Sequence, residues 1–443
     1  MKLAPLLSQT ARPVWRREPL LTALTVAVGW LFLMVPRPSG WVGEHVHKED
    51  GEVFLTDFLA RGWASVFDVY SGYLHVGPRL IVGGCASALP PEAFAGCVTA
   101  SVNGFRAFMA VLVAAALAAY LGRDRLALVA GAGMVLLPAG QMEILGNVTN
   151  MRWILVASAT ILLLARLDTW ASALVGSAVL GLAALSDPLA LALVPVALLR
   201  VLTWRGVGRL APGVFLAAAA GQAVMMRTGD RQTTPGAALL GDPVHGIQQV
   251  VVRWGAGWFG ITPVQVLCRL GTALAATVVI AAAVVLLLLV ARRVGLTRDE
   301  GHLVLLLGAA SVAFLMAALA FADLSLLSLG NWWTVADSAR YSTLAGVLWF
   351  PVVVIVAARC WDLRRSVRWS GPAALILGLS IVVGVLADAR GDTWNTNGPT
   401  WPATVAEARA SCDATGQDPT VSVTPVDVAQ PWTAQLTCRW LGK

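Results

Sequence analysis

Long apolar runs separated by short polar breaks extend over most of the chain. Runs of this length match the ~30 Å hydrocarbon core of a bilayer, so the pattern predicts about eleven transmembrane helices. The predicted spans are 19–36, 92–121, 126–142, 151–166, 170–186, 188–203, 210–226, 264–291, 302–322, 341–359 and 371–388. Only Ser186, Asp187 and Pro188 divide two of these spans. A tight turn is expected there, because proline disfavours helix in the residue before it.

Composition leads to the same class of protein. Of the 443 residues, 57% are hydrophobic and 13% are charged, whereas about a quarter of the residues in a soluble globular domain are charged. The expected fold class is therefore an all-α polytopic membrane protein. The first apolar run follows a basic segment, 12–17, and precedes Pro36-Arg37-Pro38 rather than a small-residue cleavage site, so we expect it to be retained as the first span.

The distribution of charge predicts the orientation in a cell (plasma) membrane. The formal net charge is +7, but the basic residues are spread in short clusters between apolar runs, which argues against a nucleic-acid partner. With a cytoplasmic N-terminus, the inner segments hold more than half of the Lys and Arg residues but only about a quarter of the Asp and Glu residues, as the positive-inside rule requires. An odd number of spans places the C-terminus outside. The longer polar segments 37–91, 227–263, 323–340 and 389–443 are then also outside.

The cysteines agree with an outer location for two of these segments. Cys412 and Cys438 bracket the C-terminal tail, and Cys85 and Cys97 lie close together in the sequence. In an oxidising compartment each pair is a candidate disulfide, with buried free thiols as the alternative. Cys268 and Cys360 fall in or near predicted spans, where we expect them to serve as packing residues.

The chain is predicted to have two domains, a transmembrane domain, 1–391, and a small extracytoplasmic tail, 392–443. The tail contains a helix-like stretch, 403–410, followed by segments in which apolar and polar residues alternate. Such alternation is typical of a half-buried hairpin, so a small α+β tail is expected.

The first outer loop, 37–91, carries the densest group of polar chemistry. His45, His47, Lys48, Glu49 and Asp50 follow one another just after the first span. Ionisable residues so close to lipid are costly and mark a candidate functional site. An alternative for this group is a divalent metal held by His45, His47 and Glu49, which would share one face of an extended segment.

Two short helices are expected further along this loop. The stretch 54–67 has apolar residues at helical spacing with charged residues between them, which predicts a helix lying at the membrane interface. The stretch 70–80 adds aromatic, imidazole and guanidinium groups ahead of a short apolar run. We interpret that run as a second juxtamembrane helix, with a re-entrant segment as the alternative.

An acidic pair soon after the first span, two juxtamembrane helices, many further spans and a small outer tail together resemble the GT-C superfamily of integral-membrane glycosyltransferases, in particular its actinobacterial type. The resemblance covers most of the chain in architecture. It is carried by Glu49-Asp50-Gly51, Gly72-Tyr73-Leu74-His75, Thr149-Asn150 followed by Trp153, and Arg340-Tyr341. It implies transfer of a sugar from a polyprenyl-phosphate donor to a cell-envelope glycan or glycolipid acceptor on the outer face of the bilayer.

Such a transfer needs a carboxylate that takes a proton from the acceptor hydroxyl and cations that hold the departing phosphate. Asp50, or Glu49 beside it, is the candidate base. The candidates for donor-phosphate binding are Arg340, Arg79, His75 and Tyr341. Each arginine also has the alternative role of an interfacial side chain that reaches toward lipid headgroups.

Further polar residues lie at neighbouring outer turns. For Glu143 and Asp187 the alternatives are an exposed turn carboxylate and a helix cap before Pro188. The candidates for acceptor binding or for lining an outer cavity are Glu143, Asn150, Arg152, Asp187, His47 and Tyr73.

A transporter or flippase for a lipid-linked or polar substrate is the competing function. Transporters place ionisable residues and broken helices near the middle of the bilayer. Here the polar groups gather at the outer ends of the predicted spans, which favours the enzyme. A non-catalytic partner in an envelope complex is a third possibility.

Overall fold

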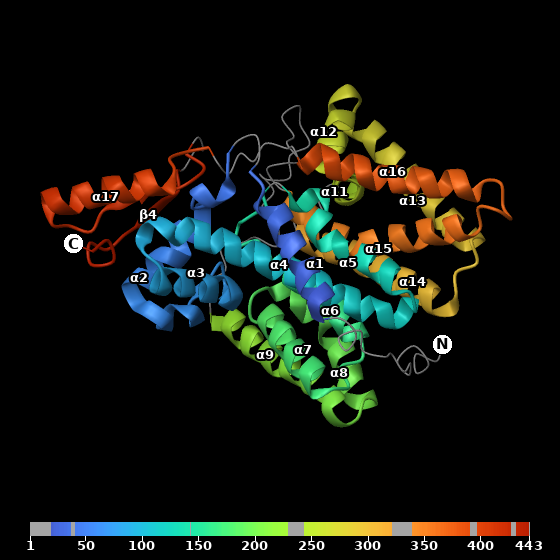
Figure 1. Ribbon diagram of the computed structural model, residues 1–443, viewed down its shortest axis with the longest axis horizontal. Helices are drawn as coiled ribbons and strands as arrows, with labels where there is room; N and C mark the ends of the chain where they lie inside the picture. The colour runs from blue at the N-terminus through green and yellow to red at the C-terminus, as the bar shows by residue number, and fades with distance from the viewer. Residues whose placement is uncertain are drawn as a thin grey trace.

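The computed structural model describes residues 19–36, 40–141, 143–228, 243–320, 339–389, 397–426 and 431–442. Within them the chain is mostly helical (Figure 1). The first part comprises α1 (Pro19–Met34), η3 (Val42–Glu44), the π-helix η4 (Asp50–Leu55), α2 (Thr56–Arg61), η5 (Gly62–Phe67), β1 (Val69–Tyr70), β2 (Tyr73–Leu74), α3 (Val76–Ala88), η6 (Pro91–Ala93) and α4 (Phe94–Leu121).

The middle part comprises α5 (Asp124–Leu136), η7 (Pro138–Gly140), α6 (Met151–Leu164), α7 (Trp170–Ala184), η8 (Pro188–Leu193), α8 (Val194–Thr203), η9 (Gly206–Arg209) and α9 (Leu210–Thr228). The last part comprises α11 (Pro243–Phe259), α12 (Ile261–Leu270), α13 (Ala273–Arg293), α14 (Arg298–Ala320), α15 (Arg340–Asp362), α16 (Ser370–Ala389), α17 (Trp401–Thr415), β3 (Thr420–Ser422) and β4 (Thr433–Gln435).

Six helical stretches of the described residues are long and apolar enough to cross a membrane: Pro91–Ala118, Gly206–Arg227, Ala273–Arg293, Arg298–Ala320, Arg340–Asp362 and Ser370–Ala389. Shorter apolar helices cover most of the other predicted spans, so a multi-pass helical membrane protein is confirmed, while a count of eleven spans stays a prediction. The predicted span 264–291 begins too early, because α13 starts only at Ala273 and the preceding residues belong to the separate helix α12. Gly271 separates α12 from α13, and the Thr272 hydroxyl caps the new helix by accepting from the Ala275 amide at 3.1 Å.

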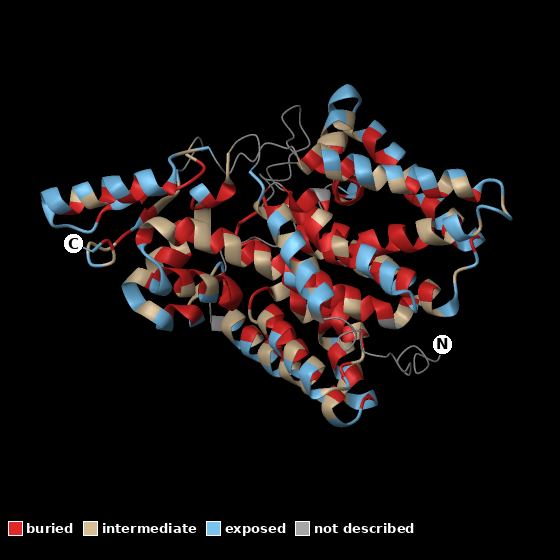
Figure 2. Ribbon diagram, viewed as in Figure 1, coloured by how far each residue is buried: buried red, intermediate tan, exposed pale blue. Residues whose placement is uncertain are grey.

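Helix α15 packs against α5, α6, α11, α14 and α16, and its ribbon, labelled in Figure 1, is coloured mostly as buried in Figure 2. In the most apolar 18-residue stretch of α15, 83% of the residues are buried inside the protein, whereas only 17% are buried in the corresponding stretch of α16. The large side chains of α16 are mostly exposed. We therefore expect α16 to face lipid, while α15 is enclosed by other helices. The first residues of α15 are consequently fixed in position by their neighbours.

Helix α11 occupies a region for which the sequence pattern predicts only an outer polar segment, 227–263. It packs closely on α15: a Cβ atom at Gly257 would lie 2.9 Å from the Cα of Gly346. The absence of side chains at both positions lets the two backbones approach. This contact brings Arg253 of α11 to the start of α15.

The first loop is more helical than its sequence pattern predicts. Helical structure runs from Asp50 to Phe67 through η4, α2 and η5, and the predicted juxtamembrane helix is α3. The short hairpin β1–β2 between them is not expected from the pattern. Because helix begins at Glu49–Asp50, the expectation of an extended segment there is wrong.

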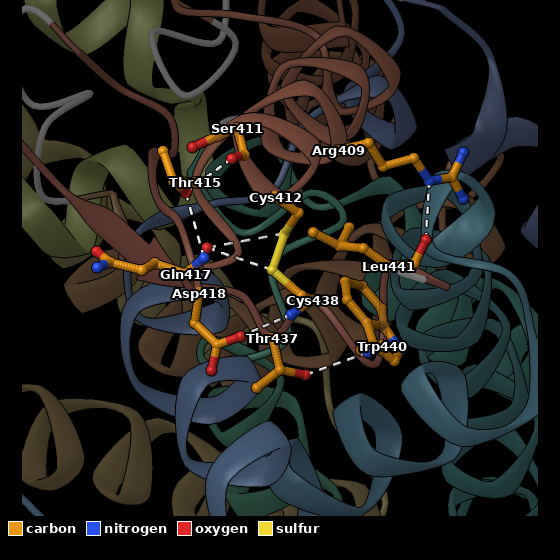
Figure 3. Close-up of a disulfide and its surroundings, with 10 residues drawn as sticks. All are labelled: Arg409, Ser411, Cys412, Thr415, Gln417, Asp418, Thr437, Cys438, Trp440 and Leu441. Carbon is orange, nitrogen blue, oxygen red and sulfur yellow. Dashed lines mark hydrogen bonds between the residues drawn. A yellow bond between two sulfur atoms is a disulfide. The ribbon is translucent and has the colours of Figure 1, made fainter.

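Both candidate disulfides are present. Cys85–Cys97 joins α3 to α4, and Cys412–Cys438 joins α17 to the segment after β4 (Figure 3), while Cys268 and Cys360 are free thiols. Strands β3 and β4 pair antiparallel, so the predicted hairpin of the tail is confirmed.

The tail packs against the first loop, at the end of the molecule where α2 and α3 lie (Figure 1). The Trp401 indole donates to the Pro91 carbonyl at 2.7 Å, and the Trp440 indole donates to the Ala86 carbonyl at 3.0 Å. Arg409 of α17 also pairs with Glu92. Two segments more than 300 residues apart in sequence therefore form one structural unit.

Candidate functional site

Five separate parts of the chain meet at the predicted polar site. They are the turn before η4, the β1–β2 hairpin, the turn between α5 and α6, the turn before η8, and the first residues of α15. The contacts described below join Asp50, Tyr73, Glu143, Arg152 and Arg340, which the sequence predicts only as separate features.

A buried arginine of α4, Arg106, holds the turn between α5 and α6 in place. Arg106 donates to the Gly140 carbonyl at 2.5 Å and to the Val135 carbonyl at 3.2 Å, so it satisfies carbonyls left free where α5 ends. This contact determines where the following residues, including Glu143, can lie.

Asp50 is buried and its carboxylate is fully engaged. One oxygen accepts from the Val148 amide at 2.9 Å, and the other accepts from the amide and hydroxyl of Thr149 at 3.1 and 2.6 Å. Burial raises the pKa of Asp50 to about 7, although the hydrogen bonds from Thr149 and Val148 oppose this rise. The side chain thus ties the first loop to the turn before α6.

Glu49 differs from Asp50 in its surroundings. It is only partly buried, and its carboxylate forms no hydrogen bond or ion pair with the described residues. Burial raises the pKa of Tyr70 to about 12 and also raises that of Tyr73, and the negative charge of Glu49 adds to both shifts. Glu49 therefore lies near both tyrosines with its carboxylate available.

Arg340 and Glu143 form the principal ion pair of the site. The guanidinium of Arg340 pairs with one carboxylate oxygen of Glu143, and its backbone amide donates to the other at 3.2 Å. The ammonium of Lys48 lies 3.9 Å from the same carboxylate. Glu143 is fully buried, whereas the Arg340 side chain keeps 16% of its surface exposed.

The ring of Tyr341 lies between two guanidinium groups. Arg340 is 5.2 Å from the ring centroid and Arg253 of α11 is 5.6 Å from it, both within range of a cation–π contact. The Trp153 ring meets Tyr341 edge-on at 5.9 Å. Arg253, which the sequence offers as a further candidate phosphate ligand in the outer segment 227–263, thus joins the site because α11 packs on α15.

Arg152 bridges two other candidates. Its guanidinium donates to the Tyr73 hydroxyl and lies 3.6 Å from a carboxylate oxygen of Asp187. The other oxygen of Asp187 accepts from the Leu189 amide at 2.8 Å, so the expected helix cap is confirmed. Burial raises the pKa of Asp187, an effect that the charge of Arg152 opposes.

Asn150 belongs to the same turn. Its amide group donates to the Glu143 carbonyl at 3.4 Å and accepts from the Trp153 indole at 3.2 Å. Asn150 thus links Glu143 to the first turn of α6.

Three predicted site residues face elsewhere. His75 stacks on Tyr73 at 4.3 Å, and burial together with the charges of Arg152 and Arg79 holds its pKa well below the usual range. Arg79 is buried and pairs with Asp57 at 2.9 Å. Both belong to the packing of the first loop. His47 is buried against the tail, where its Nδ1 lies 3.2 Å from the Thr424 hydroxyl.

The metal site considered for His45, His47 and Glu49 is not formed. No three His, Cys, Asp or Glu side chains among the described residues are placed to hold a metal ion. The His45 ring contacts the Pro399 carbonyl, and His47 contacts Thr424, both in the tail. The helical turn at Lys48 and Glu49 replaces the extended geometry that would have aligned the three side chains.

Comparisons with known proteins give one structural match. The crystal structure of the Archaeoglobus fulgidus oligosaccharyltransferase, tethered with an acceptor peptide containing the NVT sequon, is 12% identical to this chain with a TM-score of 0.42. The match covers 90% of this chain and 58% of the archaeal chain. No family model matches the sequence. No curated protein matches it either.

Proposed function

We propose that this protein is a GT-C-type membrane glycosyltransferase. It transfers a sugar from a polyprenyl-phosphate donor to a cell-envelope glycan or glycolipid acceptor on the outer face of the bilayer. The observation that carries the proposal is that the carboxylate of Glu49 lies close enough to Arg340 for their charges to interact, as Arg340 does to Arg152. Both arginine side chains keep 16% of their surface exposed.

Glu49 serves as the general base. It takes the proton of the acceptor hydroxyl while the acceptor oxygen forms a bond to the anomeric carbon of the sugar. The bond from that carbon to the phosphate oxygen breaks, and its electron pair leaves with the lipid phosphate. Both oxygens of Asp50 already accept hydrogen bonds from Val148 and Thr149, so Asp50 is not the base. Its role is to hold the neighbouring Glu49 in position.

Arg340 binds the departing phosphate, with Arg152 and Tyr341 completing the subsite. Guanidinium groups bind phosphate through charge-assisted hydrogen bonds, and those formed with the charge that develops on the leaving group speed the reaction. Tyr73, Asn150 and Asp187 lie around the same site and supply polar groups for acceptor hydroxyls. Arg79 is left out of the reaction because it pairs with Asp57, and His47 because it contacts Thr424 of the tail. His75 is left out because its ring stacks on Tyr73 within the first loop.

The test compares transfer by the wild-type protein and by Glu49→Gln in liposomes supplied with radiolabelled polyprenyl-phosphate sugars and an envelope acceptor fraction. A general base contributes about 10²- to 10⁴-fold to a rate, so Glu49→Gln should lose at least about 100-fold in kcat. Glu44→Gln, a matched change at an exposed position of the same loop, should keep full activity. Full activity in Glu49→Gln would contradict the role of Glu49. Movement of the labelled lipid across the bilayer without transfer would favour the flippase.

A further inference from the structure

The segment that carries Glu49 is held from both sides. After Glu49, the Asp50 carboxylate binds the turn before α6. Before Glu49, the contacts come from the C-terminal tail and centre on Thr424, which is fully buried. The amide of Thr424 donates to the Val46 carbonyl at 3.0 Å, and its carbonyl accepts from the Lys48 amide at 2.9 Å.

The hydroxyl of Thr424 adds two further contacts. It donates to the Val46 carbonyl at 3.0 Å and lies 3.2 Å from Nδ1 of His47. Since its single proton goes to Val46, the hydroxyl accepts from an Nδ1–H of His47. The His47 carbonyl in turn accepts from the Asp50 amide at 2.8 Å. The chain of hydrogen bonds thus runs from the tail to both sides of Glu49.

The backbone between these anchors is strained. Lys48 has a φ of 28°, in a region that residues other than glycine seldom occupy. Such conformations persist only where the surroundings determine them from several directions. The conformation of Lys48, directly before Glu49, therefore depends on these anchors.

The tail also packs directly behind the acidic pair. A Cβ atom at Gly51 would lie 2.9 Å from the Val423 side chain. The Glu52 carboxylate accepts from the Thr433 amide, and the Thr56 hydroxyl accepts from the Gln435 amide, both at 3.0 Å. The β3–β4 hairpin is thereby aligned along the first turns of η4 and α2.

We propose that Thr424 is a positioning residue for Glu49, through its hydroxyl contacts with Val46 and His47, so that the C-terminal tail sets the geometry of the base. This inference rests on the proposed function for its kinetic consequence. Its structural consequence, a Lys48–Gly51 turn ordered by the tail, is measurable without any activity.

The experiment compares three variants of the full-length protein. Thr424→Val keeps the branched shape and the backbone contacts but removes the hydroxyl, Thr424→Ser restores the hydroxyl, and Thr420→Val makes the same change at an exposed position of the same hairpin. A misplacement of about 1 Å can cost about 100-fold in rate, so Thr424→Val should lower kcat by about 10- to 100-fold. Its KM for the lipid-phosphate donor should stay within about twofold, because Arg340 and Arg152 lie on other segments. Thr424→Ser and Thr420→Val should behave as wild type.

Hydrogen exchange of the amides of residues 48–51 is measured on the same samples. It should quicken in Thr424→Val alone. Unchanged exchange in Thr424→Val would overturn the inference whatever the activity, and so would wild-type kcat or a rise in KM with constant kcat. A wild-type protein with no transferase activity would overturn the proposed function, while faster exchange in Thr424→Val would still support the role of Thr424 in ordering this turn.

Discussion

Glu143 and Arg340 lie 197 residues apart in sequence and form an ion pair at the start of α15. The carboxylate is fully buried while the guanidinium is partly exposed. Glu143 therefore holds Arg340 in position, while part of the Arg340 side chain stays exposed. Since α15 is the most enclosed of the long apolar helices, the position of this cation is set by the core of the protein.

Arg340→Gln should raise the KM for a polyprenyl-phosphate donor by about 10- to 100-fold, since a hydrogen bond to a charged group contributes about 1.5–3 kcal/mol. Because this change removes a guanidinium group from the buried carboxylate of Glu143, Arg340→Lys is measured as well. The lysine keeps the charge but loses the planar geometry that binds phosphate through two hydrogen bonds. The donor KM of Arg340→Lys should therefore lie between those of the wild type and Arg340→Gln. Donor titration of the transfer rate gives these values.

The matched control is Arg359→Gln, at the other end of the same helix. Arg359 pairs with buried Glu300 at 2.7 Å, so both variants remove one guanidinium from a buried carboxylate. Arg359→Gln should leave the donor KM unchanged. An equal rise in both variants would show a general loss of helix packing rather than loss of a phosphate ligand.

Asp50 should make stability depend on pH. Its pKa is 3.8 in the unfolded chain and about 7 in the folded protein, so between these values the folded state holds a proton that the unfolded state lacks. The contribution of Asp50 to stability is therefore greatest below about pH 4 and falls as the pH rises toward 7. Melting temperatures of wild type and Asp50→Asn in detergent, from pH 4 to 8, test this expectation. The melting temperature of the wild type should fall relative to that of Asp50→Asn as the pH rises. A difference in melting temperature that stays constant with pH would be inconsistent with a raised pKa of Asp50.

The disulfide Cys412–Cys438 should stabilise the tail and, through it, the Glu49 segment. The two cysteines are 26 residues apart, and closing a loop of that length stabilises the folded state by about 3.5 kcal/mol. Around the bond, the Asp418 carboxylate accepts from the Cys438 amide at 2.7 Å, and Arg409 donates to the Leu441 carbonyl at 3.0 Å (Figure 3). Replacing both cysteines by serine should expose the tail to limited proteolysis at a lower temperature.

Cys268→Ser is the control for this change, because Cys268 is a free thiol outside the tail. It should leave the proteolysis pattern unchanged. If the double variant cleaved no faster than Cys268→Ser, the hydrogen bonds and the Arg409–Glu92 ion pair alone would be sufficient to hold the tail.

Much of the helical framework could be predicted from the sequence, because runs of apolar residues have one stable form in lipid, where every backbone group must be hydrogen-bonded within its own helix. The disulfide pairs could be proposed because their cysteines lie in segments predicted to be on the outer, oxidising side. Glycine contacts could not be predicted this way: Gly257 and Gly346 bring α11 onto α15 and so place Arg253 on Tyr341, yet neither residue marks a helix–helix contact in the sequence.

The sequence proposes candidate residues for the site but not their arrangement, and the structure turns three of them, His75, Arg79 and His47, elsewhere. The sequence identifies Glu49, Asp50, Arg152 and Arg340 as polar residues at the ends of apolar runs. It cannot separate Glu49 from Asp50, because adjacent carboxylates have the same chemistry, and their difference arises only where Thr149 binds one and leaves the other available. Nor does it mark Thr424, whose role depends on a tail that returns to the first loop across the whole chain.

The sequence by itself determined the class of protein, a multi-pass helical membrane protein, because hydrophobic length is a property of local segments. For the tail it offered a candidate disulfide and left free thiols as the alternative. Only the tertiary structure decided which carboxylate is available, which arginines are paired and what holds the acidic turn. Those properties depend on burial and on hydrogen bonds between segments hundreds of residues apart, and burial is a property of the packed chain.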